Sequence, residues 1–362
     1  MSTIAVNAIT DANGGSTTSI NGTTPNAYNT VGKNLIINGA MQIAQRGTSA
    51  SISNGNSTYN TVDRFTNYVV DSTSTVVATV SQSTDAPDGF SNSYKWQTTT
   101  SGTLPSSGYC GVQQFIEAQT VQHLAYGTSS AKKVTLSFWV KSSVTGTYAV
   151  SVYQDDANRI TGSTYTINTA NTWEKKTVTF DGDTSGTINN DNGEGFRCIF
   201  HTGAGSDLTS TDNTSWGAYS GGKWAYGHAQ NGVIATTNAT WQITGVQLEV
   251  GESATEFEHR PYGTELQLCQ RYYEAFPVIN GGQSVALILL YRATSQYWLN
   301  LIYKVEKRAA PTFNLGSGIV WTTATPLIDL GKSSAIFLAT STGFLNEQSA
   351  TGSYSFALDS EL

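Results

Sequence analysis

The sequence VTLSFWVK, residues Val134 to Lys141, shows the pattern that decides the fold of this chain. Apolar residues occupy every second position: Val134, Leu136, Phe138 and Val140 alternate with Thr135, Ser137, Trp139 and Lys141. A period of two is typical of a β-strand with one buried face. After the linker SSVTGT the alternation resumes from Tyr148 to Tyr153, so we expect a β-hairpin here.

The same alternation recurs along the chain from Asn34 to Tyr262. It predicts strands at Trp173–Phe180 and at Trp241–Val250, where the inward face switches around Gly245 and indicates a β-bulge. Many short strands with Gly-rich turns, and almost no helical periodicity, favour an antiparallel sandwich. We predict an all-β jelly-roll sandwich over residues 34–262.

A short helix is expected next, from Thr264 to Phe276. Thr264 and Gln267 fit a capping box, Glu265 suits the positive end of a helix, and Pro277 would end it. Its apolar residues fall on two adjacent sides: Leu266, Cys269 and Tyr273 on one, Leu268, Tyr272 and Phe276 on the other. Such a helix is usually buried, here between domains or between chains.

The length of 362 residues exceeds what one hydrophobic core usually organises, so we expect more than one folded unit. Residues 1–33 are too poor in apolar side chains to bury a core and form an N-terminal attachment segment. The sandwich is followed by a connecting helix (263–277) and a small C-terminal β domain (278–362). Five strands are expected in that last domain: Gln283–Tyr291, Gln296–Lys304, Ile319–Trp321, Ala335–Ala339 and Ser353–Leu358.

Composition narrows the class of protein. Only 12% of residues are charged, but 8 Trp, 18 Tyr and 13 Phe supply the apolar mass that disordered chains lack. The net charge of −7, with no Lys/Arg cluster, argues against nucleic acid as a partner. No apolar run is long enough to span a bilayer, and no secretory signal is visible. Cys110, Cys198 and Cys269 are expected to be buried and reduced.

Three stretches resemble one family closely. They are NLIINGAMQIAQRGTS (Asn34–Ser49) with YNTVDRFTNY (Tyr59–Tyr68), ITGVQLEVG (Ile243–Gly251), and FEHRPYGTELQLCQRYYEAF (Phe257–Phe276), and YKVEKRAAPTF (Tyr303–Phe313) adds a fourth similarity. These look like the carbohydrate-binding jelly-roll modules of tail fibres and related structural proteins of tailed phages, often those of marine and cyanobacterial hosts. The resemblance implies a homotrimeric fibre in the virion, made in the host cytoplasm, whose tip contacts a host surface polysaccharide.

One loop-rich segment, His201 to Gly232, combines aromatic and short polar residues. Aromatic faces cover the apolar side of a sugar ring, while short polar side chains bond its hydroxyls. We therefore predict glycan contacts at Trp216, Tyr219, Trp224, Tyr226 and His228. The alternative is that these aromatics sit on short strands or plug the edge of the sandwich, since Trp is highly buried on average.

The C-terminal domain offers a second set of aromatic residues: Tyr291, Tyr297, Trp298, Trp321 and Phe344. Tyr297 and Trp298 are adjacent on an expected strand, so one points inward and one outward. Trp298 and Trp321 are predicted glycan contacts as well. The alternative is that these aromatics build the core of a trimer.

Catalysis and metal binding are not expected. No GxSxG, HExxH or Walker-type sequence occurs, and the acidic run from Glu249 to Glu258 fits a solvated turn. Asp155 with Asp156, and Asp181 with Asp183, could ligate Ca²⁺, but neither pair matches an EF-hand and turns favour Asp. We predict no enzyme activity, no metal and no cofactor.

Three hypotheses follow. The first is a tail fibre or receptor-binding protein: residues 1–33 dock to tail or baseplate proteins or to sister chains, and the rest reaches the host glycan. The second is a purely structural baseplate or collar component without receptor contact. The third, a glycan-cleaving tailspike enzyme, has the weakest support in the sequence.

Overall fold

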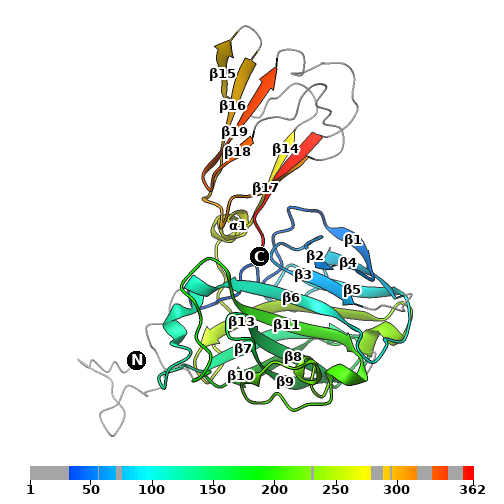
Figure 1. Ribbon diagram of the computed structural model, residues 1–362. Helices are drawn as coiled ribbons and strands as arrows, with labels where there is room; N and C mark the ends of the chain where they lie inside the picture. The colour runs from blue at the N-terminus through cyan, green and yellow to red at the C-terminus, as the bar shows by residue number, and fades with distance from the viewer. Residues whose placement is uncertain are drawn as a thin grey trace, which may run out of the picture.

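The computed structural model describes residues 32–55, 57–70, 76–229, 232–278, 288–293, 296–315, 328–340 and 354–362. Nearly all of the attachment segment expected at residues 1–33 therefore lies outside the described residues. The described chain forms two antiparallel sheets packed face to face, and further strands project from one end of this sandwich (Figure 1).

One sheet of the sandwich has six strands and the other has seven. The six-stranded sheet contains, in spatial order, β1 (Ser49–Ser53), β4 (Val77–Ser83), β5 (Ser93–Thr100), β13 (Thr240–Val250), β7 (Val134–Ser142) and β10 (Glu174–Phe180). The seven-stranded sheet contains β12 (Gly217–Ala218), β9 (Arg159–Ile167), β8 (Gly146–Gln154), β11 (Glu194–Ala204), β6 (Tyr109–Glu117), β3 (Thr66–Val70) and β2 (Ser57–Thr58). Short 3-10 helices lie at Ala118–Leu124, Ser206–Leu208, Gly221–Lys223 and Gly232–Ala235. The predicted all-β jelly-roll sandwich is confirmed.

The core between the sheets is rich in aromatic side chains. Trp96 and Trp241 are fully buried, as are Phe138, Phe196 and Phe200. Phe200 lies edge-on to Phe138, with ring centroids 5.2 Å apart. Burial of these large rings supplies much of the apolar surface that stabilises the sandwich.

The predicted β-bulge in β13 is confirmed. Gly245 has a φ of 61°, and the register of β13 against β7 shifts between Thr244 and Gln247. A side chain at this position would collide with the ring of Phe90, because the ideal Cβ would lie 2.6 Å from its Cζ. Glycine is therefore required both for the backbone conformation and for the close approach of Phe90.

The predicted hairpin across SSVTGT is wrong. β7 pairs with β10 and β13, whereas β8 pairs with β9 and β11, so the linker crosses from one sheet to the other. Ser142 and the carbonyl of Val144 hold this crossing by hydrogen bonds with the buried hydroxyl of Tyr148 (3.2 and 2.9 Å). Alternation identified both strands but carried no information about which sheet each one joins.

The predicted helix is shorter than expected and is capped differently. α1 spans Tyr262–Gln270, its N-cap is Pro261, and no side chain caps it, so the capping box of Thr264 and Gln267 is wrong. Tyr273 to Phe276, which were expected to complete the helix, lie instead on strand β14 (Tyr273–Val278). They pair with the C-terminal strand β20 (Tyr354–Asp359), and this long-range pairing overrides the local helical pattern.

Beyond α1 the chain forms two small antiparallel sheets that project from the sandwich (Figure 1). One contains β14, β20 and β17 (Thr312–Leu315), and the other contains β15 (Ile288–Ala293), β16 (Gln296–Ile302), β19 (Ser334–Thr340) and β18 (Ile328–Leu330). The strand expected at Ile319–Trp321 lies outside the described residues. That this region is an independent domain stays a prediction.

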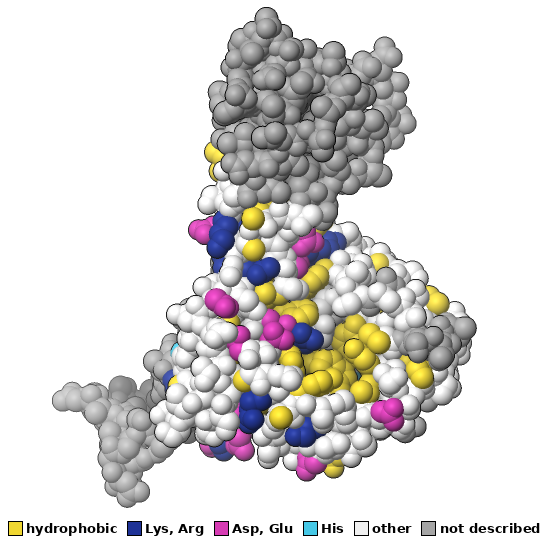
Figure 2. Space-filling model, viewed as in Figure 1, with side chains coloured by type: hydrophobic (Ala, Val, Ile, Leu, Met, Phe, Trp, Pro, Cys, Tyr) yellow, Lys and Arg dark blue, Asp and Glu magenta, His cyan; other side chains and the backbone are white. Residues whose placement is uncertain are grey.

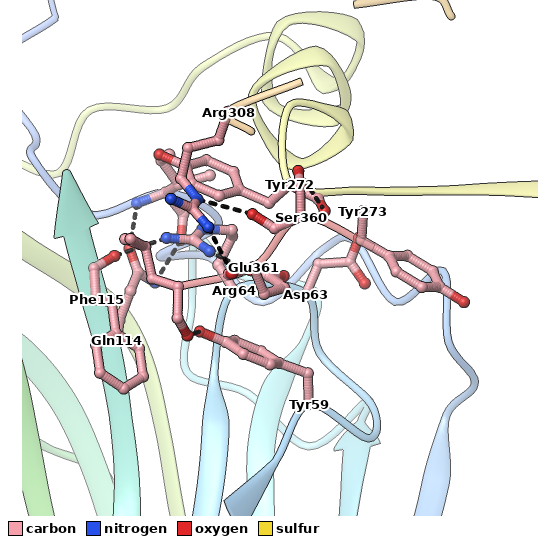
Figure 3. A network of polar contacts seen from close by, with 12 residues as sticks. Tyr59, Asp63, Arg64, Gln114, Phe115, Tyr272, Tyr273, Arg308, Ser360 and Glu361 are labelled. Carbon is pink, nitrogen blue, oxygen red and sulfur yellow. Dashed lines mark hydrogen bonds and ion pairs between the residues drawn. The ribbon is translucent and has the colours of Figure 1, made fainter. Parts of the chain in front are cut away.

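A buried ionic network joins these sheets to the sandwich, and we call it the joint (Figure 3). Arg64 is fully buried, its guanidinium carbon lies 3.3 Å over the ring of Tyr272, and it forms an ion pair with Glu361. Its Nη2 also donates to the carbonyl of Phe115 (2.6 Å). Arg308 donates to the carbonyls of Ser360 (2.8 Å) and Glu361 (2.9 Å). The last residues of the chain are thereby fixed against the sandwich.

A second contact of the joint is centred on Glu117. Arg271 donates to both of its carboxylate oxygens (2.8 and 2.9 Å), and the hydroxyl of Tyr272 donates to one of them. Burial raises the pKa of Glu117, but the hydrogen bonds from Arg271 and Tyr272 outweigh burial and lower it overall. The exit of the chain from the sandwich is therefore held by charge as well as by packing.

No helix among the described residues is both long and apolar enough to cross a bilayer.

Candidate functional site

The outward face of the seven-stranded sheet is the candidate site. On β6, β8 and β11 one set of alternating side chains fills the core between the sheets, so the other set points outward. That outward set includes Tyr109 and Phe115 on β6, Tyr153 on β8 and Arg197 on β11. Side chains that face solvent on a strand are ordinarily polar, so aromatic residues here call for an explanation.

Three of these side chains form a row across neighbouring strands. Arg197 is paired in register with Phe115 on one side and Tyr153 on the other. Its guanidinium carbon lies 4.6 Å from the centroid of the Phe115 ring and 5.2 Å from that of Tyr153. All three side chains are half-buried, so part of each remains open to solvent. We call Phe115, Arg197 and Tyr153 the aromatic row.

Arg197 already has an anionic partner. Its Nε and Nη2 donate to the two oxygens of Glu194 (2.9 and 2.8 Å), a bidentate arrangement. Burial lowers the pKa of Arg197, but the hydrogen bonds and charge of Glu194 outweigh burial and raise it overall. The planar guanidinium is thus held in its charged form between the rings of Phe115 and Tyr153.

Part of the segment from Gly205 to His228 folds over the same sheet. The ring of Tyr219 lies edge-on to Tyr153, with centroids 5.6 Å apart, and edge-on to Trp224 at 5.8 Å. Trp224 is buried and also lies edge-on to Tyr109 (5.6 Å). Figure 2 shows hydrophobic side chains gathered over β6, β11 and β8, with charged side chains beside them. The aromatic row and Tyr219 therefore belong to one continuous aromatic surface.

The five loop residues predicted as glycan contacts differ in exposure and in packing. Tyr219 is exposed and adjoins the aromatic row, whereas Trp224 and His228 are buried. Trp216 stacks on Phe196 (6.1 Å) and donates its Nε1 to the carbonyl of Asp181 (2.7 Å), so it packs against the edge of the core. Tyr226 is half-buried. Of these five residues, Tyr219 is both exposed and in contact with the aromatic row, so it is favoured as a direct contact of this surface.

One of the two glycan contacts predicted in the C-terminal region lies on a described strand. Trp298 lies on β16, opposite Leu290 and Leu338. Trp321 lies outside the described residues. The prediction that these two residues bind glycan is neither supported nor contradicted.

A buried polar cluster beneath Trp224 anchors the loop. The hydroxyl of Ser151 donates to the carbonyl of Trp224 (2.8 Å) and lies 3.3 Å from Nε2 of His201. The hydroxyl of Tyr68 lies 3.2 Å from Nδ1 of the same ring, and Nε2 of His228 bonds the carbonyl of His201 (3.0 Å). Burial lowers the pKa of His201 well below its usual range, and the charge of His228 adds to this.

This cluster brings a serine and a histidine within hydrogen-bonding reach, as a hydrolase requires. Ser151 and His201 are both fully buried, however, and the serine hydroxyl is committed to the carbonyl of Trp224. A substrate would have no access to the hydroxyl without displacement of the loop. The arrangement fits a structural role, which is to fasten the loop to β8 and β11.

Three of the four aspartates considered as calcium ligands have partners within the protein. Asp183 accepts two hydrogen bonds from Arg159 (2.6 and 3.0 Å), Asp156 accepts from the backbone of Asn189 (2.9 Å), and Asp181 lies 3.3 Å from Lys133. Within the described part of the chain, no group of three or more His, Cys, Asp or Glu residues is arranged to hold a metal ion.

Sequence reasoning missed the aromatic row, although its signal was present. Phe115, Arg197 and Tyr153 lie far apart in sequence, and only the strand register brings them together. The signal is an aromatic residue at a strand position that faces away from the core. Tyr153 is an example, since it alternates with Val150 and Val152, which point into the core.

No protein-family model matches the chain, and no curated protein matches it at a significant level. Solved structures with some likeness include a putative sugar-binding protein of Bacteroides thetaiotaomicron (13% identity over 60% of this chain and 100% of that one, TM-score 0.34). A family 11 carbohydrate-binding module of a Clostridium thermocellum cellulase shares 12% identity over 57% of this chain and 98% of its own length (TM-score 0.30).

The enzymatically active domain of tailspike protein 4 of Bacteriophage CBA120 is similar at 14% identity over 60% of this chain, with a TM-score of 0.33. The chain spans 21% of the length of that solved chain. Likenesses with TM-scores near 0.3 place the chain in no family. Its function has to be inferred from its own residues.

Proposed function

We propose that this chain is an attachment protein that binds a surface glycan through the outward face of its seven-stranded sheet. The observation that carries the proposal is the aromatic row, in which two partly exposed rings and a planar guanidinium lie side by side across three strands. Such a surface matches the apolar face of a sugar ring, and Tyr219 extends it. No bond-breaking chemistry is part of the proposal.

The wider setting that we propose is a phage tail fibre, in which residues 1–33 contact tail or baseplate proteins and sister chains form a homotrimer. The sequence motifs at Asn34–Ser49, Ile243–Gly251 and Phe257–Phe276 support this setting. Native mass spectrometry of the full chain should then give a trimer. A monomer would contradict the fibre assignment but leave glycan binding open.

The direct test of glycan binding is affinity electrophoresis of the full chain through gels that contain bacterial surface polysaccharides. Wild-type protein should be retarded, and the variant Phe115→Ala should lose most of the retardation. Trp173→Ala is the matched control, because Trp173 is also half-buried but lies next to β10 of the other sheet, over Lys141. Equal behaviour of the two variants would contradict the proposed face.

A structural baseplate or collar protein is the second candidate function. It would share the fold but would have no receptor. Purified chain added to host cells should compete with adsorption of a phage that carries it if the first function is correct. Unchanged adsorption at saturating protein would favour the structural role.

A further inference from the structure

The charges around the aromatic row indicate which class of glycan it takes. This inference rests on the proposed function, because it concerns the ligand of the same face. An arginine on an aromatic surface usually suggests recognition of a carboxylate or a phosphate, since the guanidinium fork matches both. The contacts of Arg197 point the other way.

One bidentate edge of the Arg197 guanidinium is already occupied by a carboxylate of the protein. Glu194 occupies its Nε and Nη2 in a bidentate pair, and both sides of the guanidinium are flanked by rings. The side chain of Glu194 is only 12% exposed, so a ligand cannot displace it without leaving a poorly solvated carboxylate. The positive charge of the row is therefore neutralised within the protein.

Two exposed carboxylates lie beside the row. Asp155 and Asp156 are exposed in the turn that directly follows β8, the strand of Tyr153. Burial raises the pKa of Glu194, Arg197 opposes this shift, and the charges of Asp155 and Asp156 add to it. The two aspartates are thus close enough to act on the row. Their field repels an anionic sugar within a screening length of about 8 Å at physiological salt.

We propose that the aromatic row binds an uncharged glycan and discriminates against polysaccharides that carry uronate or other acidic groups. Arg197 acts there as a flat extension of the two rings rather than as an anion receptor. Polar contacts to sugar hydroxyls remain available at the edges, as at Asn158, which accepts a hydrogen bond from the hydroxyl of Tyr153 (2.9 Å).

The test uses the full chain and a panel of bacterial surface polysaccharides, neutral and uronate-bearing, each acidic one also in carboxyl-reduced form. The inference is supported if neutral and carboxyl-reduced members bind at least several-fold more tightly than the acidic parents. Their affinity should also be unchanged from low to high salt. Tighter binding to acidic members that Phe115→Ala abolishes would overturn the inference and leave the proposed function standing. Absence of binding to every member would overturn both.

Two substitutions sharpen the test because each removes one negative charge. Glu194→Gln frees Arg197, and Asp155→Asn weakens the acidic field. Each should raise affinity for the acidic members roughly two- to five-fold, the scale of an exposed ion pair. Asp88→Asn is the control, since Asp88 is an exposed carboxylate in the loop between β4 and β5 of the other sheet. An equal rise in the control would show a net-charge effect and would contradict the role of Glu194.

Discussion

Two arginines of this chain make the same kinds of contact in opposite surroundings. Arg64 and Arg197 each lie against an aromatic ring and each pair with a glutamate, Glu361 and Glu194 respectively. The side chain of Arg64 is fully buried, whereas that of Arg197 is 22% exposed. Solvent access, rather than the chemistry of the contact, therefore separates a residue that holds the joint from one that forms a surface.

The partners of the two arginines match the different burial of their side chains. A buried charge needs a partner that does not leave, and Arg64 has the carboxylate of Glu361, the ring of Tyr272 and the carbonyl of Phe115. Arg197 keeps its partner Glu194, but 22% of its side chain is exposed, so water screens part of its charge. The first arrangement fixes the C-terminus to the sandwich, and the second leaves a surface that a ligand can cover.

The largest effect is expected for Arg64→Met. Removal of the guanidinium leaves the buried carboxylate of Glu361 with Arg46 (3.2 Å) as its remaining cationic partner, so we expect a loss of about 3 kcal/mol of unfolding free energy, the lower end for a broken buried pair. Urea unfolding followed by tryptophan fluorescence measures this loss. Arg197→Met serves as the control, because the same change is made where solvent reaches. Equal losses for the two variants would contradict the comparison.

The next effect concerns binding rather than stability. Tyr153→Ala removes one ring of the aromatic row and should weaken glycan binding by about 30-fold, equivalent to about 2 kcal/mol for a central aromatic contact. Tyr153→Phe should retain most of the affinity because the ring remains. Calorimetric titration with a polysaccharide that binds the wild type measures both. Tyr262→Ala, on the exposed side of α1, should bind as the wild type does.

The sandwich could be predicted from sequence because alternation records burial, strand by strand. The strands around Phe138 and Trp241 were located correctly for this reason. Alternation does not record which strands become neighbours, so the crossing between β7 and β8 was mistaken for a hairpin. Pairing of Tyr273–Val278 with β20 was missed for the same reason.

The candidate site was predicted in part. The sequence directed attention to the loop that carries Tyr219 and Trp224, and Tyr219 does adjoin the aromatic row. The row itself depends on the register of three strands, and no local pattern encodes that register. The sequence also does not show which aromatic side chains are exposed. Trp216 packs against the core and Trp224 is buried, although both lie in the same segment as the exposed Tyr219.

The stability of the chain should depend on pH through His201 and His228, which are buried beneath the aromatic surface. Burial lowers the pKa values of His201 and His228 in the folded chain, so the unfolded chain takes up protons first as pH falls below about 6.5. Stability should be constant above that pH and should fall as pH decreases from 6.5 to 5. Urea midpoints measured across this range report the slope.

The histidine pair can be separated from other titrating groups by substitution. His201→Gln with His228→Gln should flatten the slope, whereas His123→Gln should leave most of it, because His123 is less buried and lies on the 3-10 helix after β6. The raised pKa of buried Asp63 gives the opposite sign, since the folded chain then binds the additional proton. A slope that the double substitution of His201 and His228 leaves unchanged would contradict the role of the histidines.

The smallest effect is expected for the stability of Arg197→Met. The change removes a partly exposed ion pair and leaves Glu194 in limited contact with water, so we expect a loss of about 1 kcal/mol, while the methionine keeps apolar contact with Phe115 and Tyr153. A double-mutant cycle with Glu194→Gln should therefore give a coupling energy below about 1 kcal/mol. The corresponding cycle of Arg64→Met with Glu361→Gln should give a clearly larger value, because neither group reaches solvent. If the two couplings were equal, solvent access would not be what distinguishes the aromatic row from the joint, and Arg197 would have to be regarded as a structural residue.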